Sequence, residues 1–330
     1  MHEVVGRNVA LVGDIGGTRA RFALADLDGT RLRGFTSFEV RDFRTIRDAL
    51  KAYLSGEGVR PHVVSLAVAA PVTGRQVSLT NADWTFDHGD VCQATGAARV
   101  RFVNDFEALA RVLPDLTARD VATLVDGAYE PAAPRIVLGP GTGFGVASLV
   151  TTRNGRVAVA GEGGHVTFGA TTDEERTIRD HLALRHGHVS VERVLSGSGI
   201  EAIHEALGNP RLPVAEIVAK AMAGEAAPRA TIDVFARLLA RVAGDMALVL
   251  GARGGVYIAG GIAPRILPAL DSDTFRNAFR DKGRMAAYLD GVPVRVITAQ
   301  DAGIRGAAAA AGDPFDDSEP ARHLAGWAHH

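Results

Sequence analysis

Short runs of hydrophobic residues, many of them β-branched, recur through positions 8–104 and end at Gly, Asp or Pro. Short continuous or alternating runs predict strands, and apolar positions three or four residues apart predict helices. The pattern therefore predicts an α/β unit at the start of the chain. Its expected strands cover 8–13, 19–25, 32–40, 63–69, 76–79 and 100–104, with helices over 43–54 and 89–95.

The same pattern starts again after a predicted helix over 106–113 and a passage at 120–134 that is rich in Ala, Asp and Pro. Residues 9–24 and residues 135–150 each predict a strand, a glycine-rich tight turn and a second strand. Repetition of one plan indicates two related lobes, and a chain of 330 residues is long enough for two domains of about 100–200 residues each. We expect a cleft between them.

The second lobe is expected to be richer in helices. Apolar residues such as Val234, Leu238 and Val242 trace helical spacing in the longest of them. The expected helices cover 173–184, 199–207, 214–223, 228–250, 265–270 and 274–282, with strands over 255–259 and 294–298. An Ala-rich tail helix over 304–311 is expected to return to the first lobe.

Composition excludes several classes of function. The formal net charge is -2 and no run of Lys or Arg resembles a tract that binds nucleic acid or a membrane surface. The single cysteine, Cys92, cannot form an internal disulfide, and one thiol provides too few ligands for a structural zinc site. No basic signal-like start and no apolar run of about 20 residues is present. We therefore expect a cytoplasmic protein without nucleic-acid or membrane partners.

Glycine-rich loops are the strongest candidates for chemistry. Asp14, Gly16, Gly17 and Thr18 lie between two predicted strands, where backbone N–H groups can converge on an anion. In isolation, a Gly-Gly pair there is more typical of a plain hairpin turn. The second loop, 139–145, carries four alternating glycines and a hydroxyl, which exceeds the needs of one hairpin and favours a paired phosphate clamp.

The second loop centres on Gly141, Thr142 and Gly143, and it matches neither the G-x-G-x-x-G spacing of dinucleotide sites nor a Walker loop. A third cluster, Gly260 and Gly261, ends a predicted strand before Pro264. It either admits a flat adenine or makes a simple strand-to-helix turn, and the segment alone does not decide between them.

The three loops in this order, together with Val103-Asn104-Asp105-Phe106, resemble the phosphate, adenosine and catalytic elements of the sugar kinase, actin and Hsp70 superfamily. The bacterial glucokinase family is closer still. Two strings carry that closer resemblance, Gly161-Glu-Gly-Gly-His165 and Glu192-Arg-Val-Leu-Ser-Gly197, and they are supported by Thr80-Asn-Ala-Asp-Trp84. The resemblance runs in order over most of the chain.

The resemblance implies an actin-like, ribonuclease H-like ATPase fold with a duplicated mixed-sheet core and an interlobe cleft. The smaller lobe would comprise 1–116 and 302–330, and the larger 117–301. It implies transfer of a phosphoryl group from MgATP to glucose, with Asp105 as the catalytic base. The implied sugar contacts are Asn81, Asn104, Asp105, Glu162, His165 and Glu192. The implied ATP contacts are Asp14, Gly16, Gly17, Thr18, Gly141, Thr142, Gly143, Gly260 and Gly261, with Asp14 holding Mg²⁺ through water.

Each polar candidate also has a simpler interpretation. Asp105 opens a predicted helix, where an N-cap is common. Glu162 and His165 fit a solvated turn, Glu192 fits the first turn of a helix, and Asp14 fits an ordinary turn. The family resemblance favours the functional interpretation, most strongly for Asp105.

Three other functions remain open. Mannose or fructose would be the preferred hexose if the site recognises a different arrangement of hydroxyls. A sugar-responsive repressor would need a DNA-binding extension and a zinc-binding cysteine cluster, and an actin-like or Hsp70-like switch has no use for the sugar strings.

We expect a homodimer, because bacterial glucokinases, which this sequence resembles, are often homodimers.

Overall fold

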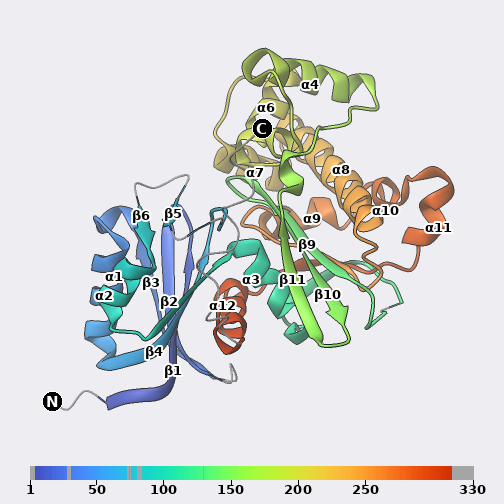
Figure 1. The fold of residues 1–330 in the computed structure, drawn as a ribbon. Coiled ribbons are helices and arrows are strands. Elements are labelled where there is room, and N and C mark those ends of the chain that lie inside the picture. Colours follow the sequence, from blue (N-terminus) through green and yellow to red (C-terminus); the bar gives the residue numbers. More distant parts are fainter. Residues whose placement is uncertain are drawn as a thin grey trace, which may run out of the picture. The chain divides into compact units, whose positions relative to one another are not determined.

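The computed structural model describes residues 4–27, 31–72, 74, 76–79, 84–128 and 130–313, with side chains from residue 8 onward. The chain divides into two compact units. Unit 1 comprises Met1–Val112 and Asp301–His330, and unit 2 comprises Leu113–Gln300. Each unit is built on a sheet covered by helices (Figure 1).

Unit 1 contains a five-stranded sheet, among its described residues, in the order β3-β2-β1-β4-β7. Strand β1 is parallel to β4, and β4 is parallel to β7. Strand β2 is antiparallel to both of its neighbours, β1 and β3. A small antiparallel pair, β5 and β6, stands apart. The strands are β1 (Val4–Ile15), β2 (Arg19–Asp26), β3 (Leu32–Glu39), β4 (Val59–Val68), β5 (Gln76–Ser78), β6 (Thr85–Asp87) and β7 (Arg99–Asn104).

Local sequence signals define the helices of unit 1. Thr45 and Asp48 form a capping box at the start of α1, and Gly58 ends that helix in the left-handed conformation. Asp87 and Asp90 form the equivalent box for α2. The helices are α1 (Ile46–Glu57), α2 (His88–Thr95), α3 (Asp105–Val112) and α12 (Ala302–Gly312), with a short 3₁₀ turn, η1 (Val40–Asp42).

Strand alternation gives the unit 1 sheet two apolar faces. Larger residues such as Leu11 and Leu66 face the side of α1 and α2. Small residues such as Ala10 and Ala67 face α3 and α12. The Ala-rich sequence of α12 suits this face, because small side chains let α12 approach α3 closely. The predicted return of the tail helix to the first lobe is therefore seen in unit 1.

Unit 2 contains a six-stranded mixed sheet, among its described residues, in the order β11-β10-β9-β12-β13-β8. Strand β12 is parallel to both β9 and β13, and the outer pairs are antiparallel. The strands are β8 (Val121–Val125), β9 (Arg135–Pro140), β10 (Phe144–Thr152), β11 (Gly155–Gly161), β12 (Val256–Ile258) and β13 (Val294–Ile297).

The remaining elements of unit 2 are mainly helical. The helices are α4 (Asp173–His186), α5 (Val191–Val194), α6 (Gly197–Ala206), α7 (Val214–Met222), α8 (Ala226–Val249), α9 (Leu267–Leu270), α10 (Asp273–Arg280) and α11 (Ala286–Leu289). Short 3₁₀ turns are η2 (Leu113–Asp115), η3 (Gly163–His165), η4 (Ala263–Ile266) and η5 (Gly283–Met285).

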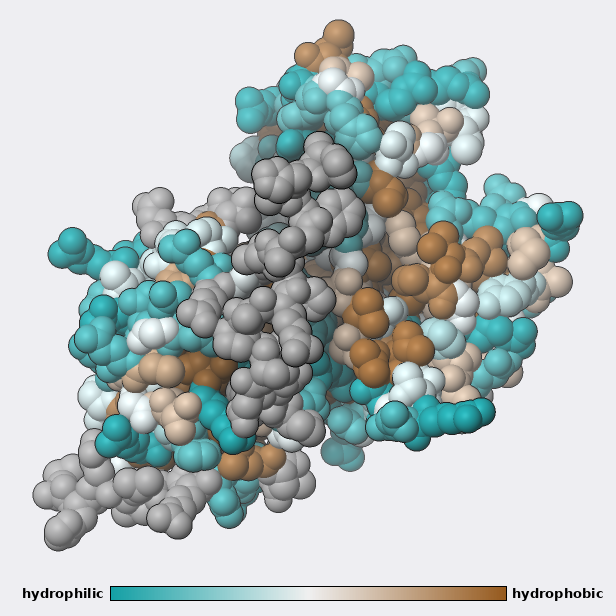
Figure 2. Space-filling view, in the orientation of Figure 1, coloured by the Kyte–Doolittle hydropathy of each residue, from teal (hydrophilic) through white to brown (hydrophobic). Residues whose placement is uncertain are grey.

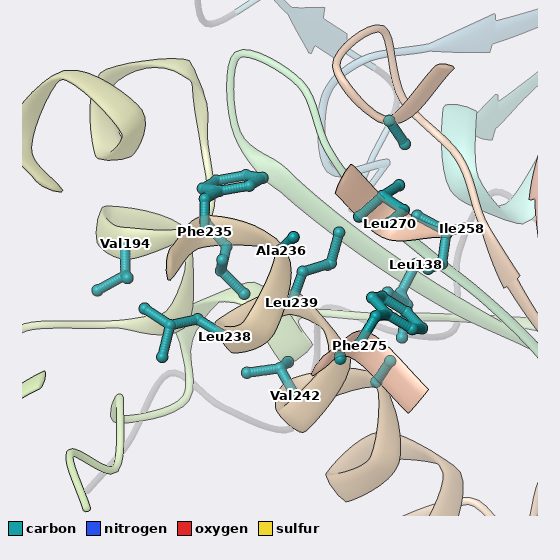
Figure 3. Packing of buried hydrophobic residues seen from close by; sticks show 14 of the residues in the cluster. Leu138, Val194, Phe235, Ala236, Leu238, Leu239, Val242, Ile258, Leu270 and Phe275 are labelled. Atoms are coloured by element: carbon teal, nitrogen blue, oxygen red, sulfur yellow. The ribbon is translucent and has the colours of Figure 1, made fainter. Parts of the chain in front are cut away.

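Helix α8 is the centre of the unit 2 core. Its Phe235, Leu238 and Leu239 are fully buried among residues from the sheet and from neighbouring helices, including Leu138 of β9 and Phe275 of α10 (Figure 3). Burying a side chain of this size contributes about 1.5–3 kcal/mol. The predicted apolar stripe of this helix is confirmed as its buried face.

Strand β11 forms one edge of the unit 2 sheet, and the sequence analysis did not predict it. Its Val157 and Val159 are each 49% exposed. Hydrophobic groups are visible on the face of unit 2 that carries β10 and β11 (Figure 2). An exposed edge of this kind can pair with another chain.

Among the described residues, no helix is both long enough and apolar enough to span a bilayer.

A buried ion pair joins α8 to the start of α4. Arg241 lies 2.5 Å from Glu175, which is 3% exposed, and also donates to the carbonyl oxygen of Gly169 and the hydroxyl of Thr171. Burial acts to raise the pKa of Glu175, but hydrogen bonds from Arg241 and Thr171 outweigh it and hold that pKa below its usual range.

We predict that Arg241→Met lowers the stability of unit 2 by about 3–5 kcal/mol at pH 7, because it leaves a buried carboxylate without its cation. Arg276→Met, which removes an exposed pair with Asp271, should cost no more than about 1 kcal/mol. Urea unfolding followed by circular dichroism measures both. Equal losses in the two variants would contradict a special role for the buried pair.

The same pair predicts a pH dependence. A depressed pKa in the folded state gives stability that is present at neutral pH and is lost as pH falls through the acidic range. In Arg241→Met, protonation of Glu175 relieves the unpaired charge. The stability gap between the wild type and Arg241→Met should therefore narrow between about pH 6 and pH 4, and a gap that widens on acidification would refute the assignment.

Candidate functional site

The first glycine loop and Asp105 lie at the same edge of the unit 1 sheet. Parallel pairing aligns Ile15 of β1 with Val68 of β4, and Val68 with Asn104 of β7. The carboxyl ends of these strands therefore meet, although the residues are far apart in sequence. Ligands of open α/β sheets bind at such an edge.

The first glycine loop is a tight connection between β1 and β2. The Gly16 N–H donates to the carbonyl oxygen of Arg19, and the Thr18 carbonyl oxygen accepts from the Val40 N–H. Gly17 is partly exposed, and Thr18 is exposed. The loop thus presents small residues and a hydroxyl at the sheet edge.

Asp14 is held between a cation and a helix. Its carboxylate lies 2.5 Å from Arg21, the residue opposite it in the β1–β2 register. It also lies against Gly303 in the first turn of α12, where an added Cβ would come within 2.5 Å of the carboxylate. Burial raises the pKa of Asp14, and the charge and hydrogen bond of Arg21 offset only part of that effect.

Asn104, and not Asp105 alone, caps helix α3. The Asn104 side-chain oxygen accepts from the N–H groups of Phe106 at 3.0 Å and Glu107 at 3.2 Å. Its amide nitrogen donates to Ala70. Asp105 is the first helical residue, and its carboxylate accepts from the Phe106 N–H at 2.9 Å. Asn81, another predicted sugar contact, lies outside the described residues.

The second and third glycine loops meet at one edge of the unit 2 sheet. Parallel pairing aligns Leu138 of β9 with Ile258 of β12, so both strands end together. Gly260 has φ +87°, and a Cβ there would come within 2.2 Å of the Pro140 carbonyl oxygen. In the second loop, the Gly141 N–H donates to the Gly143 carbonyl oxygen at 2.8 Å. Thr142 and Gly261 are exposed.

Backbone pairing brings the two sugar strings together. Thr167 forms an antiparallel bridge with Ser190. The Val191 N–H donates to Val166 and the Phe168 N–H donates to Val189. Helix α5, which contains Glu192, therefore lies against the η3 turn, which contains His165. Residues separated by more than twenty positions thus become neighbours.

Glu162 and His165 lie on the short turn η3. Their side chains are 66% and 61% exposed, and Glu162 Oε2 is 3.7 Å from His165 Nε2. Between them, Gly164 is buried against β10, where a Cβ would come within 2.2 Å of the Phe144 carbonyl oxygen. Only glycine permits this approach, which fixes the turn beside the second glycine loop.

Glu192 makes a contact that the sequence analysis missed. Its Oε2 accepts from the Phe144 N–H at 2.9 Å, directly after the turn at 141–143 that forms the centre of the second glycine loop. The side chain is half-buried at the start of α5. No pattern in the sequence signals this bond, because residues 144 and 192 are joined only by tertiary structure. Glu192, the η3 turn and the second loop therefore meet at Phe144.

Comparisons with known proteins agree over most of the chain. The glucokinase family model matches residues 11–314. The chain is 40% identical over 321 residues to the glucokinase of Chromobacterium violaceum, covering 94% of this chain and 92% of that protein. It is 41% identical over 313 residues to the glucokinase of Caulobacter vibrioides, covering 92% and 95%.

The chain belongs to the glucokinase family. The predictions of family and of an ATP-dependent sugar kinase, a phosphotransferase, are confirmed. Family membership also implies glucose and ATP as substrates.

Solved structures confirm the predicted fold class. A glucokinase from an Antarctic psychrotroph aligns with a TM-score of 0.81 at 36% identity, covering 92% of this chain and 98% of that chain. A ROK hexokinase from Thermus thermophilus aligns with a TM-score of 0.63 at 19% identity, covering 91% and 97%, which is a likeness of fold alone. The two mixed-sheet α/β units thus have the architecture of glucokinases and ROK sugar kinases.

The capping geometry of this glucokinase family member yields a test. Asn104→Ala removes the acceptor for two N–H groups and should lower stability by about 1 kcal/mol. Asn104→Asp keeps an acceptor and should retain most of that stability, whereas Asp105→Ala should cost less than Asn104→Ala. Chemical unfolding of the three variants measures this. A larger loss for Asp105→Ala would make Asp105 the principal cap.

Proposed function

We propose that this member of the glucokinase family transfers the γ-phosphoryl group of ATP to the 6-hydroxyl of D-glucose, with Asp105 as the general base. The observation that carries the proposal is the meeting of the two sugar strings with the second glycine loop at Phe144. The proposed sugar-binding segments and the proposed phosphate-binding loop thereby meet at the two peptide groups of one residue, Phe144.

Asp105 is proposed to accept the proton of the attacking hydroxyl. As the sugar oxygen bonds to the γ-phosphorus, the bond from that phosphorus to the β,γ-bridging oxygen breaks, and ADP leaves. Asn104 accepts from both Phe106 and Glu107, so the cap of α3 does not depend on the Asp105 carboxylate, which also accepts from Phe106. The position of Asp105 at the carboxyl edge of the sheet is typical of catalytic groups in α/β folds.

The glycine loops are proposed to bind ATP. Gly16, Gly17 and Thr18 in unit 1 would offer N–H groups and a hydroxyl to phosphate oxygens, and Gly141, Thr142 and Gly143 would do so in unit 2. The exposure of both threonines supports this role. Gly260 and Gly261 end β12 beside the second loop, which supports a place for them near the adenosine.

Asp14 is proposed to hold Mg²⁺ through water. Among the described residues, no group of three or more His, Cys, Asp or Glu side chains could form a dedicated metal site. A single carboxylate at the edge of a phosphate loop fits Mg²⁺, which retains several waters and is held mainly by substrate phosphates. When bound, Mg²⁺ would neutralise charge on the phosphates.

Recognition of the sugar is assigned to carboxylates, an imidazole and amides: Asn81, Asn104, Asp105, Glu162, His165 and Glu192. The exposure of the Glu162 and His165 side chains supports this assignment, because exposed hydrogen-bonding groups can reach a ligand. These residue types suit any ring of hydroxyls and do not distinguish glucose from mannose or fructose. The proposal of glucose therefore rests on the family of the chain.

We also propose a cytoplasmic homodimer. The single cysteine suits a reducing compartment. The exposed edge strand β11, with Val157 and Val159, offers a self-complementary surface for a second copy.

We predict release of ADP that depends on both glucose and Mg²⁺, because phosphoryl transfer needs an acceptor and charge neutralisation. A coupled ADP assay with a panel of hexoses measures it. If mannose or fructose gives a much higher kcat/KM than glucose, the enzyme class stands and the substrate changes. Turnover that is indifferent to every sugar would refute the proposal.

Asp105→Ala should lower kcat by about 10²- to 10⁴-fold, the usual contribution of a positioned base, while the KM for glucose changes less. Thr45→Ala serves as the structural control, because it removes the cap of α1 in the same unit at a residue with no proposed role in binding or catalysis. If both variants lose activity in proportion to their lost stability, Asp105 is structural.

A further inference from the structure

Glu192 lies at the junction of the second glycine loop and the sugar strings. Its Oε2 accepts the Phe144 N–H at 2.9 Å. The same oxygen lies so close to Gly143 that a Cβ on that residue would come within 2.4 Å of it. The carboxylate therefore lies against the last residue of the loop and is hydrogen-bonded to the peptide that follows.

The backbone that carries Glu192 is firmly held. The N–H of Val191 donates to Val166, and the Leu195 N–H donates to Val191. The Ser190 hydroxyl caps the short helix α5 by accepting from the Arg193 N–H. The loop itself consists of Gly141, Thr142 and Gly143, and glycine loses the most conformational freedom when it is ordered.

We propose that Glu192 is a positioning residue for the second glycine loop and that, through it, glucose and ATP bind cooperatively. The proposal rests on the proposed function, which assigns a sugar contact to the same carboxylate. An ionised carboxylate has about four acceptor positions, and the Phe144 N–H uses one. A sugar hydroxyl bound at the other oxygen would fix the rotamer that holds the loop.

The physical consequence is a shared ordering cost. Once glucose has fixed the carboxylate, ATP binds a loop that is already restricted, so less of its binding free energy is spent on ordering. Linkage requires the effect to be reciprocal, so that ATP tightens glucose binding by the same factor. The functional role of Glu192 thus extends from the sugar to the nucleotide.

The test is calorimetric titration with AMPPNP and Mg²⁺, with and without saturating glucose. In the wild-type protein, saturating glucose should lower the Kd for AMPPNP by a factor of about 5 or more. Glu192→Ala should bind AMPPNP about 10-fold more weakly than wild type even without glucose, and glucose should no longer help. Glu192→Gln, whose amide oxygen can still accept from Phe144, should retain most of the sugar-free affinity.

Glu201→Ala is the matched control. Glu201 also accepts a backbone N–H in unit 2, from Val214 at 2.8 Å, but on another segment. It should leave AMPPNP binding unchanged. If Glu201→Ala weakens AMPPNP as much as Glu192→Ala does, or if Glu192→Ala binds it like wild type, the positioning role is overturned.

A double-mutant cycle tests the contact directly. Gly143→Ala should weaken AMPPNP binding in the wild-type background, because the new methyl group displaces the Glu192 carboxylate. In the Glu192→Ala background the same change should have little further effect. Additive losses would show that the carboxylate does not hold the loop. Folding of each variant is checked by its melting curve.

Failure of this proposal is distinguishable from failure of the proposed function. Wild-type ADP release that depends on glucose establishes the function regardless of Glu192. Active wild-type enzyme whose AMPPNP affinity is unaffected by glucose would refute the coupling alone.

Discussion

The peptide groups flanking Phe144 hold both proposed sugar-binding segments of unit 2 against one strand. The carbonyl oxygen of this residue lies where a side chain at position 164 would be, and its N–H is bonded to Glu192. Because β10 fixes Phe144 in the sheet, the η3 turn and helix α5 are both placed relative to one strand. The proposed sugar groups of unit 2 are therefore positioned by that strand as well as by the backbone pairing between their own segments.

Parallel pairing determines which loops can act together within each unit. In unit 1, β1 and β7 both pair with β4, which aligns Asp14 and Asp105 at one edge despite some ninety intervening residues. In unit 2, β12 pairs directly with β9, and two glycine loops meet. A duplicated plan therefore gives two edges of the same kind: one carries the proposed base, and the other lies beside Glu162, His165 and Glu192, three of the six proposed sugar contacts.

The sequence was informative where local physics decides the outcome. Most helices and the central strands follow from hydrophobic spacing, and the glycine loops fall at strand ends as predicted. Three strands were missed, β6 at 85–87, β8 within the passage at 120–134 and β11 at 155–161, because a strand that is paired on one side only needs little hydrophobic pattern. The roles of the candidate site residues remain predictions.

Tertiary hydrogen bonds explain the other omissions. That Asn104 rather than Asp105 is the principal cap depends on a one-residue difference in where α3 begins, and helix ends are the least determined feature of a pattern. The bond from Phe144 to Glu192 joins positions 48 residues apart in the chain, so no spacing rule reveals it. Family resemblance named Glu192 as a sugar contact, which stays a prediction, and it could not indicate the hydrogen bond to Phe144.

The environment of Asp14 shows how sheet register and charge are linked. Its ion pair with Arg21 exists because the β1–β2 hairpin places residues 14 and 21 opposite each other. A shift of one residue would turn Arg21 to the other face of the sheet. Burial then would raise the pKa of Asp14 without opposition from that cation. The length of the first glycine loop, set by Gly16, Gly17 and Thr18, therefore affects how readily the Asp14 carboxylate carries a negative charge.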